Sequence, residues 1–297
     1  MALYPQAGRA AAAATGALSC FEPGFDIAAS RAEARALAAE EPREDVAEVV
    51  DLEADGVRCR LYRPGDATPG VVLHLHGGGF VFHDIDVHDA AARRLANRAG
   101  LGVLSVDYRL APEHPFPAAP NDVDTVLGWL DRESGALGLD GPAYVHGDSA
   151  GGNLALVAAL RHPGRFRALA LLYPFLDPSA GFASYADPVD GGFDPREAAW
   201  YWQQYAATPA DLTDPDLAPL RSDRLAALPP TMVLSAEHDP LRDEAEHLAG
   251  LLAEAGVAVV AGRQLGQIHG FWRHADVFDA AEPLVRQVAG FFRLHHP

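Results

Sequence analysis

The sequence predicts an α/β fold, in which a mostly parallel central sheet is flanked by helices and carries a helical cap. Two observations predict this class. From residue 71 onward, short apolar runs alternate with helix-like segments, and this alternation is typical of parallel strands covered by helices on both faces. The first of these runs, Val71–Leu75, has the apolar character of a strand that is buried on both faces.

The chain before residue 71 supplies a helical start and an antiparallel edge. Residues 10–41 are rich in alanine and show no strand-like alternation, so we expect helix up to Pro42. Residues 46–52 and 57–62 each have the pattern of a strand. Asp55-Gly56 lies between them and is a turn signal, which predicts an antiparallel pair.

The elements after residue 71 alternate along the chain. Besides the run already named, the expected strands are 101–106, 143–145, 168–172, 231–235 and 257–260. The expected helices are 89–98, 119–130, 150–160, 242–255 and 281–294. Such a series predicts one large sheet between two layers of helices.

One segment interrupts the alternation. Between residues 177 and 230 there is no convincing strand pattern, and an aromatic cluster of Trp200, Trp202 and Tyr205 occurs there. A connection of this length needs structure of its own. We therefore expect an inserted helical lid.

Composition limits the classes of partner and location. The 297 residues include 49% hydrophobic residues and carry a net charge of −18, which disfavours nucleic acids and anionic membrane surfaces as partners. The two cysteines, Cys20 and Cys59, do not make a disulfide framework. No apolar run reaches the roughly 18 residues of a membrane span, and the alanine-rich start lacks most features of a signal peptide. We expect a cytoplasmic protein that does not bind membranes.

A nucleophilic serine is predicted at Ser149. The stretch Gly147-Asp-Ser-Ala-Gly151 is a G-x-S-x-G motif between an expected strand and an expected helix, which is the context that a nucleophile elbow requires. The alternative is a glycine-rich connection that binds a phosphate. The chain has neither a G-K-[ST] nor a G-x-G-x-x-G motif, so we favour the nucleophile.

Donors for a developing oxyanion are predicted upstream. His76-Gly-Gly-Gly79 directly follows the strand at 71–75, and glycines there let backbone N–H groups approach a ligand closely. We expect the oxyanion hole to consist of the N–H groups of Gly77, Gly78 and Ala150, and the alternative for the loop is a flexible turn.

The base and the acid are predicted from chain order. Among 13 histidines, His269 follows the last expected strand and precedes the last helix. Asp239 follows the preceding strand, with Glu237 and Asp243 as rival carboxylates. No H-E-x-x-H motif occurs, so a zinc protease has no support. The predicted catalytic residues are therefore Ser149, Asp239 and His269.

Longer motifs extend beyond these residues. They are Asp107-Tyr-Arg-Leu-Ala-Pro-Glu-His-Pro-Phe-Pro117, Gly147-Asp-Ser-Ala-Gly-Gly152, Leu228-Pro-Pro230, Asp239-Pro-Leu-Arg-Asp-Glu244 and Ile268-His-Gly-Phe271. Together they resemble the signatures of the hormone-sensitive-lipase-like family of α/β-hydrolases, the group of bacterial carboxylesterases with an HGGG loop. The resemblance covers most of the chain, and the joint occurrence of the motifs is highly specific.

The resemblance implies the domain organisation. It makes residues 1–44 the N-terminal part of a helical cap and residues 178–218 an inserted cap segment. Residues 45–177 and 219–297 then form the α/β-hydrolase core.

The resemblance also implies a function. It predicts a serine carboxylesterase that hydrolyses short- to medium-chain acyl esters through an acyl-enzyme intermediate, with a small-molecule ester as its partner. The mechanism requires no metal or cofactor, and a homodimer is compatible with it. Five aromatic residues are pocket candidates, on the hypothesis that the cap supplies apolar walls, with ordinary packing as the alternative for each. They are Phe80, Phe82, Tyr108, Trp200 and Trp202.

Three alternative functions stay open at this point. An amidase or formamidase would use the same triad, and so would a tailoring hydrolase that removes acyl groups from a secondary metabolite. A small-molecule binding protein on the same fold is the non-enzymatic alternative, and the presence of His269 argues against it.

Overall fold

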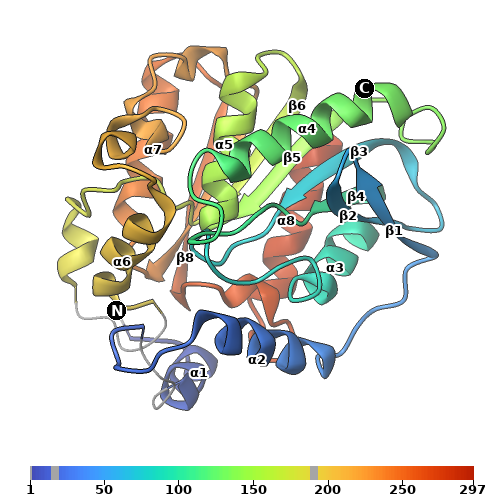
Figure 1. The fold of residues 1–297 in the computed structure, drawn as a ribbon. Helices are drawn as coiled ribbons and strands as arrows, with labels where there is room; N and C mark the ends of the chain where they lie inside the picture. The colour runs from blue at the N-terminus through green and yellow to red at the C-terminus, as the bar shows by residue number, and fades with distance from the viewer. Residues whose placement is uncertain (1, 15–19, 188–192) are drawn as a thin grey trace.

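The centre of the protein is an eight-stranded sheet with the order β1-β2-β4-β3-β5-β6-β7-β8 (Figure 1). The computed structural model describes residues 2–14, 20–187 and 193–297. The strands are β1 (Glu48–Ala54), β2 (Val57–Arg63), β3 (Thr68–Leu75), β4 (Leu101–Val106), β5 (Ala143–Asp148), β6 (Phe166–Leu172), β7 (Thr231–His238) and β8 (Val259–Ile268). Only β2 runs antiparallel to its neighbours, β1 and β4, so the predicted mostly parallel sheet with an antiparallel edge is confirmed.

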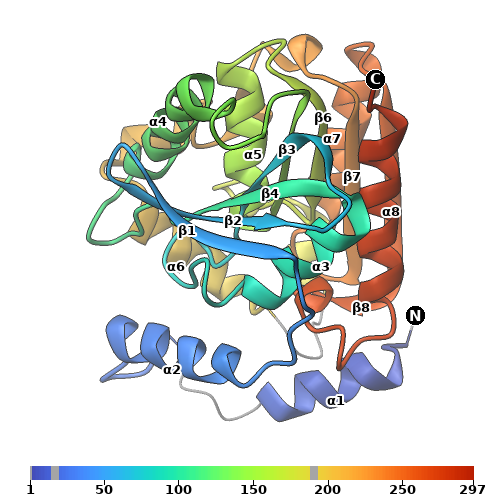
Figure 2. The same cartoon turned by 90° about the vertical axis from the view of Figure 1, so that its right-hand side faces the viewer.

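Helices pack on both faces of this sheet and across one of its ends. They are α1 (Pro5–Ala14), α2 (Ile27–Ala39), α3 (Asp89–Ala99), α4 (Ala118–Glu133), α5 (Ala150–Arg161), α6 (Pro195–Tyr205), α7 (Arg242–Glu254) and α8 (Ala281–Leu294). Side chains of α4, α5 and α7 belong to one core cluster, and those of α3 and α8 to the other. In Figure 2, α4 and α5 lie on one side of the sheet and α8 on the other.

The alternation of side chains along β3 shows how the strand joins both layers. Leu73 belongs to the cluster beneath α4 and α5, whereas its neighbour Val72 belongs to the cluster beneath α8. Because successive side chains of a strand point to opposite faces, a strand between two helix layers is apolar at most positions. This explains the apolar run from which the strand was predicted, in which His74 is the one polar residue between Val71 and Leu75.

The predicted helix over residues 10–41 is wrong in its extent. The structure divides this region into α1 and α2. Pro23 and Gly24 (φ +93°) lie in the connection, and the Asp26 carboxylate caps α2 by accepting hydrogen bonds from the N–H groups of Ala28 and Ala29. Part of the connection, residues 15–19, lies outside the described residues.

The helices α1 and α2 lie across the end of the sheet at which β5 and β8 stop (Figures 1 and 2). Arg31 of α2 donates to the carbonyls of Val81 and Ala111, which belong to the loops after β3 and β4. Tyr4, next to α1, donates its N–H to the Gly266 carbonyl of β8 at 3.1 Å. The N-terminal helices are thus bound to the loops at the carboxyl ends of the strands, where α/β folds place their ligands.

The segment between β6 and β7 is helical, as predicted. It contains α6 and four short 3-10 helices, and no strand occurs in its described part, residues 173–187 and 193–230. Within the described ranges 2–14, 20–187 and 193–297, none of the helices is both long and apolar enough to cross a membrane.

Candidate active site

Ser149 lies at a sharp turn between β5 and α5. Its backbone has φ 53° and ψ −123°, a region that residues other than glycine rarely adopt. A Cβ atom on Gly147 would lie 2.1 Å from the Gly151 carbonyl oxygen, and one on Gly151 would lie 2.0 Å from the Leu75 carbonyl oxygen. Both positions therefore require glycine, as expected for a nucleophile elbow.

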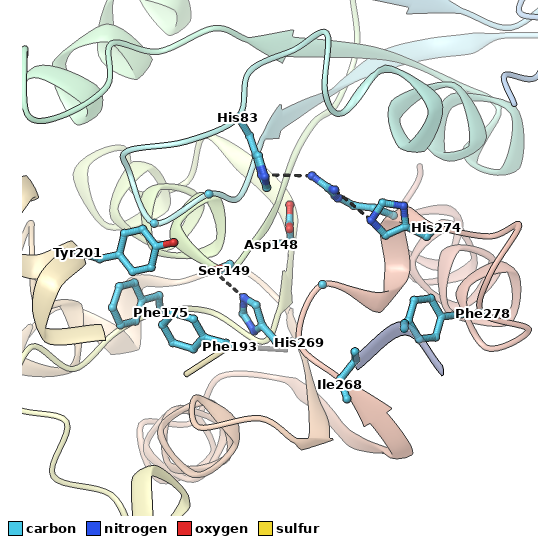
Figure 3. A pocket seen from close by; sticks show the side chains of 15 residues that line it. His83, Asp148, Ser149, Phe175, Phe193, Tyr201, Ile268, His269, His274 and Phe278 are labelled. Atoms are coloured by element: carbon cyan, nitrogen blue, oxygen red, sulfur yellow. Dashed lines mark hydrogen bonds between the residues drawn. The ribbon is translucent and has the colours of Figure 1, made fainter. Parts of the chain in front are cut away.

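The structure brings Ser149, His269 and Asp239 together. His269 Nε2 lies 3.0 Å from Ser149 Oγ (Figure 3). On the other side of the ring, His269 Nδ1 lies 2.7 Å from Asp239 Oδ2. Asp239 is only 2% exposed, and its other oxygen accepts the Leu241 N–H at 2.9 Å. An ionised carboxylate only accepts hydrogen bonds, so His269 carries its proton on Nδ1 and presents a lone pair to Ser149.

The two rival carboxylates are engaged elsewhere. Glu237 accepts the Gly266 N–H at 2.7 Å. Asp243 pairs with Arg242 at 2.8 Å and accepts the Ser184 N–H at 2.9 Å. Among the candidates, Asp239 is the carboxylate that contacts His269.

The HGGG loop places its N–H groups differently from the prediction at one position. The Gly77 N–H donates to Asp148 Oδ1 at 3.1 Å, so it points away from Ser149 and is not free for an oxyanion. The next two glycines, Gly78 (φ +125°) and Gly79 (φ +61°), line the cavity beside Ser149. Across the described ranges, neither of their N–H groups has a hydrogen-bond partner. The predicted donor Gly77 is therefore engaged elsewhere, and the N–H groups of this loop that lie at the cavity without a partner among the described residues are those of Gly78 and Gly79.

The loop is supported from behind by aromatic packing. The Tyr108 hydroxyl donates to the His76 carbonyl at 2.6 Å, and the two rings stack with centroids 4.2 Å apart. On the other side, the Tyr201 ring covers Gly79 so closely that a Cβ atom there would lie 2.2 Å from it. These contacts hold the backbone N–H groups in fixed directions before any ligand binds, as electrostatic preorganisation requires.

A cavity of about 470 Å³ opens beside Ser149. Its walls differ in character, as Figure 3 shows: Phe175, Phe193 and Tyr201 lie on one side of Ser149, and His83 and His274 lie on the other. Arg273 also lines the cavity and donates to both of these histidines. The cavity therefore has an aromatic wall and a basic wall on either side of the serine.

The sequence profile of the α/β hydrolase fold matches residues 72–273. The chain belongs to the α/β-hydrolase family. Two relatives are an ethyl acetate hydrolase of Pseudomonas putida, 37% identical over 75% of this chain and 74% of that protein, and the carboxylic ester hydrolase LipN of Mycobacterium tuberculosis, 40% identical over 83% and 70%. A solved structure, a hyperthermophilic esterase from the archaeon Pyrobaculum calidifontis, superimposes with a TM-score of 0.88 at 36% identity and covers 98% of this chain and 97% of its own.

These comparisons confirm the resemblance to the hormone-sensitive-lipase-like family and the α/β-hydrolase fold. The relatives match the chain over most of their own length, so their similarity is not confined to one motif.

The aromatic residues predicted for the pocket lie outside the lining of this α/β-hydrolase cavity. Phe80 stacks on Tyr205 with centroids 3.8 Å apart, and Trp202 packs behind Phe175 at 4.2 Å. Tyr108 lies behind the HGGG loop, as described above. Phe82 and Trp200 stack on each other at 6.0 Å, near Phe25 of the N-terminal segment. None of the five lines the cavity, so the prediction that they form its walls is wrong.

Several cavity residues escaped prediction. Phe175 follows β6 by three positions, and Arg273 and His274 follow His269 by four and five, so their places after strands at the carboxyl edge of the sheet were a usable signal. Phe193 and Tyr201 belong to the inserted segment, whose course the sequence does not define.

A cluster of buried histidines lies beneath the site. His74, His88 and Asp148 bring potential ligand atoms within 4.8 Å of one another. However, Arg273 Nη1 lies 3.4 Å from His88 Nε2, and Asp148 accepts the Gly77 N–H. Arg273 contacts His88 at Nε2, whereas His88 Nδ1 lies 3.7 Å from Asp148 Oδ1, so the guanidinium and the carboxylate face different nitrogens of this ring.

Proposed function

We propose that this chain is a serine carboxylesterase that hydrolyses short- to medium-chain acyl esters through an acyl-enzyme intermediate. The observation that carries the proposal is the relay from Asp239 through His269 to Ser149, with distances of 2.7 and 3.0 Å, at the wall of a cavity. The relatives support the substrate class, because their names are those of ester hydrolases. A cavity of about 470 Å³ suits an acyl group of modest size.

The first half of the proposed reaction acylates the serine. His269 Nε2 accepts the Ser149 Oγ proton as Oγ attacks the ester carbonyl carbon. The resulting oxyanion accepts hydrogen bonds from the N–H groups of Gly78, Gly79 and Ala150. His269 then donates its proton to the leaving oxygen, the alcohol departs, and Ser149 holds the acyl group as an ester.

The second half releases the acid. Water enters the place of the alcohol and gives a proton to His269 as its oxygen attacks the acyl carbon. The same N–H groups donate hydrogen bonds to the second oxyanion, and His269 returns the proton to Ser149 Oγ. Asp239 stays ionised throughout and stabilises the imidazolium that forms in each half.

The replacement Ser149→Ala tests the proposal. Without Oγ no acyl-enzyme can form, so kcat for a short p-nitrophenyl ester should fall about 10⁴-fold or more, and covalent labelling by an organophosphate should disappear. Ser105→Ala is a matched control, because Ser105 is also buried (1% exposed) and its Oγ has no partner among the described residues. Near-normal turnover by the Ser149 variant would overturn the assignment.

No specific observation favours the alternative functions. The amidase or formamidase, the tailoring hydrolase and the binding protein all remain compatible with the fold. The relatives' names indicate ester hydrolysis, so we propose that reaction.

We also propose that residues 1–44 and 178–218 act as a cap over a core of residues 45–177 and 219–297. Ala10 from the first segment and Phe193 and Tyr201 from the second line the cavity, which supports this division. Residues 1, 15–19 and 188–192 of the two segments lie outside the described residues.

A cytoplasmic location and a homodimer stay predictions. In the described chain β8 pairs with β7 alone, and Val260 and Leu265 of β8 are 43% and 48% exposed, which supports an interface at this edge. Sedimentation equilibrium would test the dimer, and fractionation of the producing cells would test the location.

A further inference from the structure

Arg273 places a positive charge in the wall of the catalytic cavity. It follows His269 by four residues, and it is partly buried at the basic wall opposite Phe175 and Phe193. Its guanidinium donates through Nη1 to His83 Nδ1 at 3.2 Å and to His88 Nε2 at 3.4 Å, and through Nη2 to His274 Nε2 at 3.0 Å. Every partner of this guanidinium in the described part of the chain is a histidine ring.

Within residues 2–14, 20–187 and 193–297, no carboxylate lies within 4.0 Å of a nitrogen of Arg273. The two nearest candidates are held by other donors. Asp148 accepts the Gly77 N–H, and Glu41 lies 3.2 Å from His274 Nδ1, on the far side of that ring. The charge of Arg273 is therefore not cancelled by a direct ion pair.

The histidines orient the guanidinium without neutralising it. His274 Nδ1 faces the Glu41 carboxylate and must donate, so its Nε2 is free to accept from Arg273. Burial, followed by the charge of Arg273, lowers the pKa of both His83 and His88 well below the ordinary range, so both rings are neutral acceptors at neutral pH. A guanidinium held in this way presents its remaining N–H donors in a fixed fork.

We propose that the catalytic cavity selects esters that also carry a carboxylate, and that Arg273 is the residue that binds this carboxylate. The inference rests on the proposed esterase function and adds the substrate class. Arginine matches the planar, two-oxygen shape of a carboxylate. The aromatic wall of Phe175, Phe193 and Tyr201 takes the uncharged part of the substrate, so the two parts lie on opposite sides of Ser149.

The negative charge of the rest of the molecule confines anion binding to the cavity that holds Arg273. The net charge of −18 repels anions from the surface in general. Surface charges are screened beyond roughly 8 Å at physiological salt, whereas a partly buried guanidinium acts at contact with little screening. A carboxylate-bearing ester therefore gains its favourable interaction only inside the cavity.

The test compares substrates that differ only in charge. One pair is 4-nitrophenyl hydrogen succinate and its methyl ester, which place the charge on the acyl side. A second pair is O-acetylglycolate and its methyl ester, which place it on the alcohol side. We expect the wild-type protein to hydrolyse the charged member of at least one pair with a kcat/KM at least about 10-fold above that of the neutral member.

Arg273→Gln then isolates the residue. This variant loses the charged hydrogen bond to the substrate carboxylate, so kcat/KM for the charged ester should fall about 10- to 100-fold. The kcat/KM for the neutral methyl ester should change by less than about 3-fold. Arg273→Lys should retain part of the preference. Arg286→Gln is the control, since it removes the same charge from an arginine on α8 that is 66% exposed and remote from the cavity.

Three outcomes would overturn the inference. The first is an equal loss of kcat/KM for the charged and neutral esters in Arg273→Gln, which would make Arg273 a support of the loop alone. The second is that the wild-type protein shows no preference for either charged ester. The third is that free succinate does not inhibit hydrolysis of the neutral esters. The last two measurements use the wild-type protein, so they decide the matter even if the variant fails to fold. Failure of the proposed esterase function has a different signature, which is the absence of turnover and of organophosphate labelling for every ester.

Discussion

Asp148 and Ser149 are neighbours in sequence, but their side chains make different contacts at the site. Ser149 projects Oγ toward His269, whereas the Asp148 side chain turns back and accepts the Gly77 N–H. Asp148 is 3% exposed, so this hydrogen bond is shielded from water. The contact joins the elbow to the HGGG loop.

Removal of the Asp148 carboxylate should therefore slow the reaction without weakening substrate binding. In Asp148→Ala the Gly77 N–H loses its acceptor and the loop loses its anchor, so we expect kcat to fall about 10- to 100-fold with KM within about 3-fold. Asp148→Asn keeps an amide oxygen that can accept from Gly77, and its loss should be smaller. Steady-state kinetics with a neutral ester measure both variants. A normal kcat for the alanine variant would contradict a positioning role.

At the residue scale, the reactive side chains can be predicted from the sequence. The backbone N–H groups that assist them are harder to predict. Ser149, Asp239 and His269 follow from motif and chain order. The choice among three consecutive glycines does not, because the direction of an N–H depends on dihedral angles such as the φ of +125° at Gly78. Arg273 was missed for a similar reason, since an arginine beyond the histidine motif becomes a cavity residue only through the turn at Gly270 (φ +80°).

At the scale of elements, the inserted segment is fastened at both of its ends by one side chain of α5. Asn153 Nδ2 donates to the Phe175 carbonyl, where the chain leaves the core, and to the Leu217 carbonyl, where it returns, each at 2.9 Å. Asn153 is completely buried. The helix that starts at the nucleophile therefore also closes the base of the segment that carries Phe193 and Tyr201.

Asn153→Ala should destabilise the protein through these two carbonyls. Each loses a buried donor, and a buried polar group left unpaired costs about 1–3 kcal/mol, so we expect a loss of roughly 2–6 kcal/mol in the free energy of unfolding by urea. Asn97→Ala is the control, because Asn97 donates its amide to Glu44 and Asp45 near the surface of α3. Equal stability losses in the two variants would show that the tie between Phe175 and Leu217 has no special importance.

The strands and helices of the core could be predicted from the sequence more fully than those of the cap. β3 and β6 are buried on both faces and have apolar runs that can be recognised without a structure. β8 lies at the sheet edge, with exposed residues along most of its length, so only its first residues gave a strand pattern. The aromatic residues of α6 were correctly placed in a helix near the site. Which of them face the cavity depends on how α6 packs, and Tyr201 faces it whereas Trp202 faces the core.

At the scale of the whole molecule, buried neutral histidines should govern stability in mild acid. Burial is the main reason why the pKa values of four histidines, His74, His83, His88 and His146, are lowered, and the pKa of His146 falls to about 3. Unfolded histidines bind protons near pH 6.5, so the stability present above that pH is lost as the pH falls toward these depressed values. Glu244 opposes the trend, because burial raises its pKa and favours the protonated folded state.

We expect the free energy of urea unfolding to decrease from about pH 7 to about pH 5, with each buried histidine contributing up to about 1.4 kcal/mol per pH unit. Most carboxylates stay ionised over this range, so histidines dominate the slope. His146→Gln cannot bind the proton and should flatten the slope, even if it lowers stability at neutral pH, since His146 Nδ1 lies 3.0 Å from His74 Nδ1. His114→Gln, at an exposed position, should leave the slope unchanged. A His146 variant whose stability runs parallel to that of the wild type would contradict this account of the buried cluster.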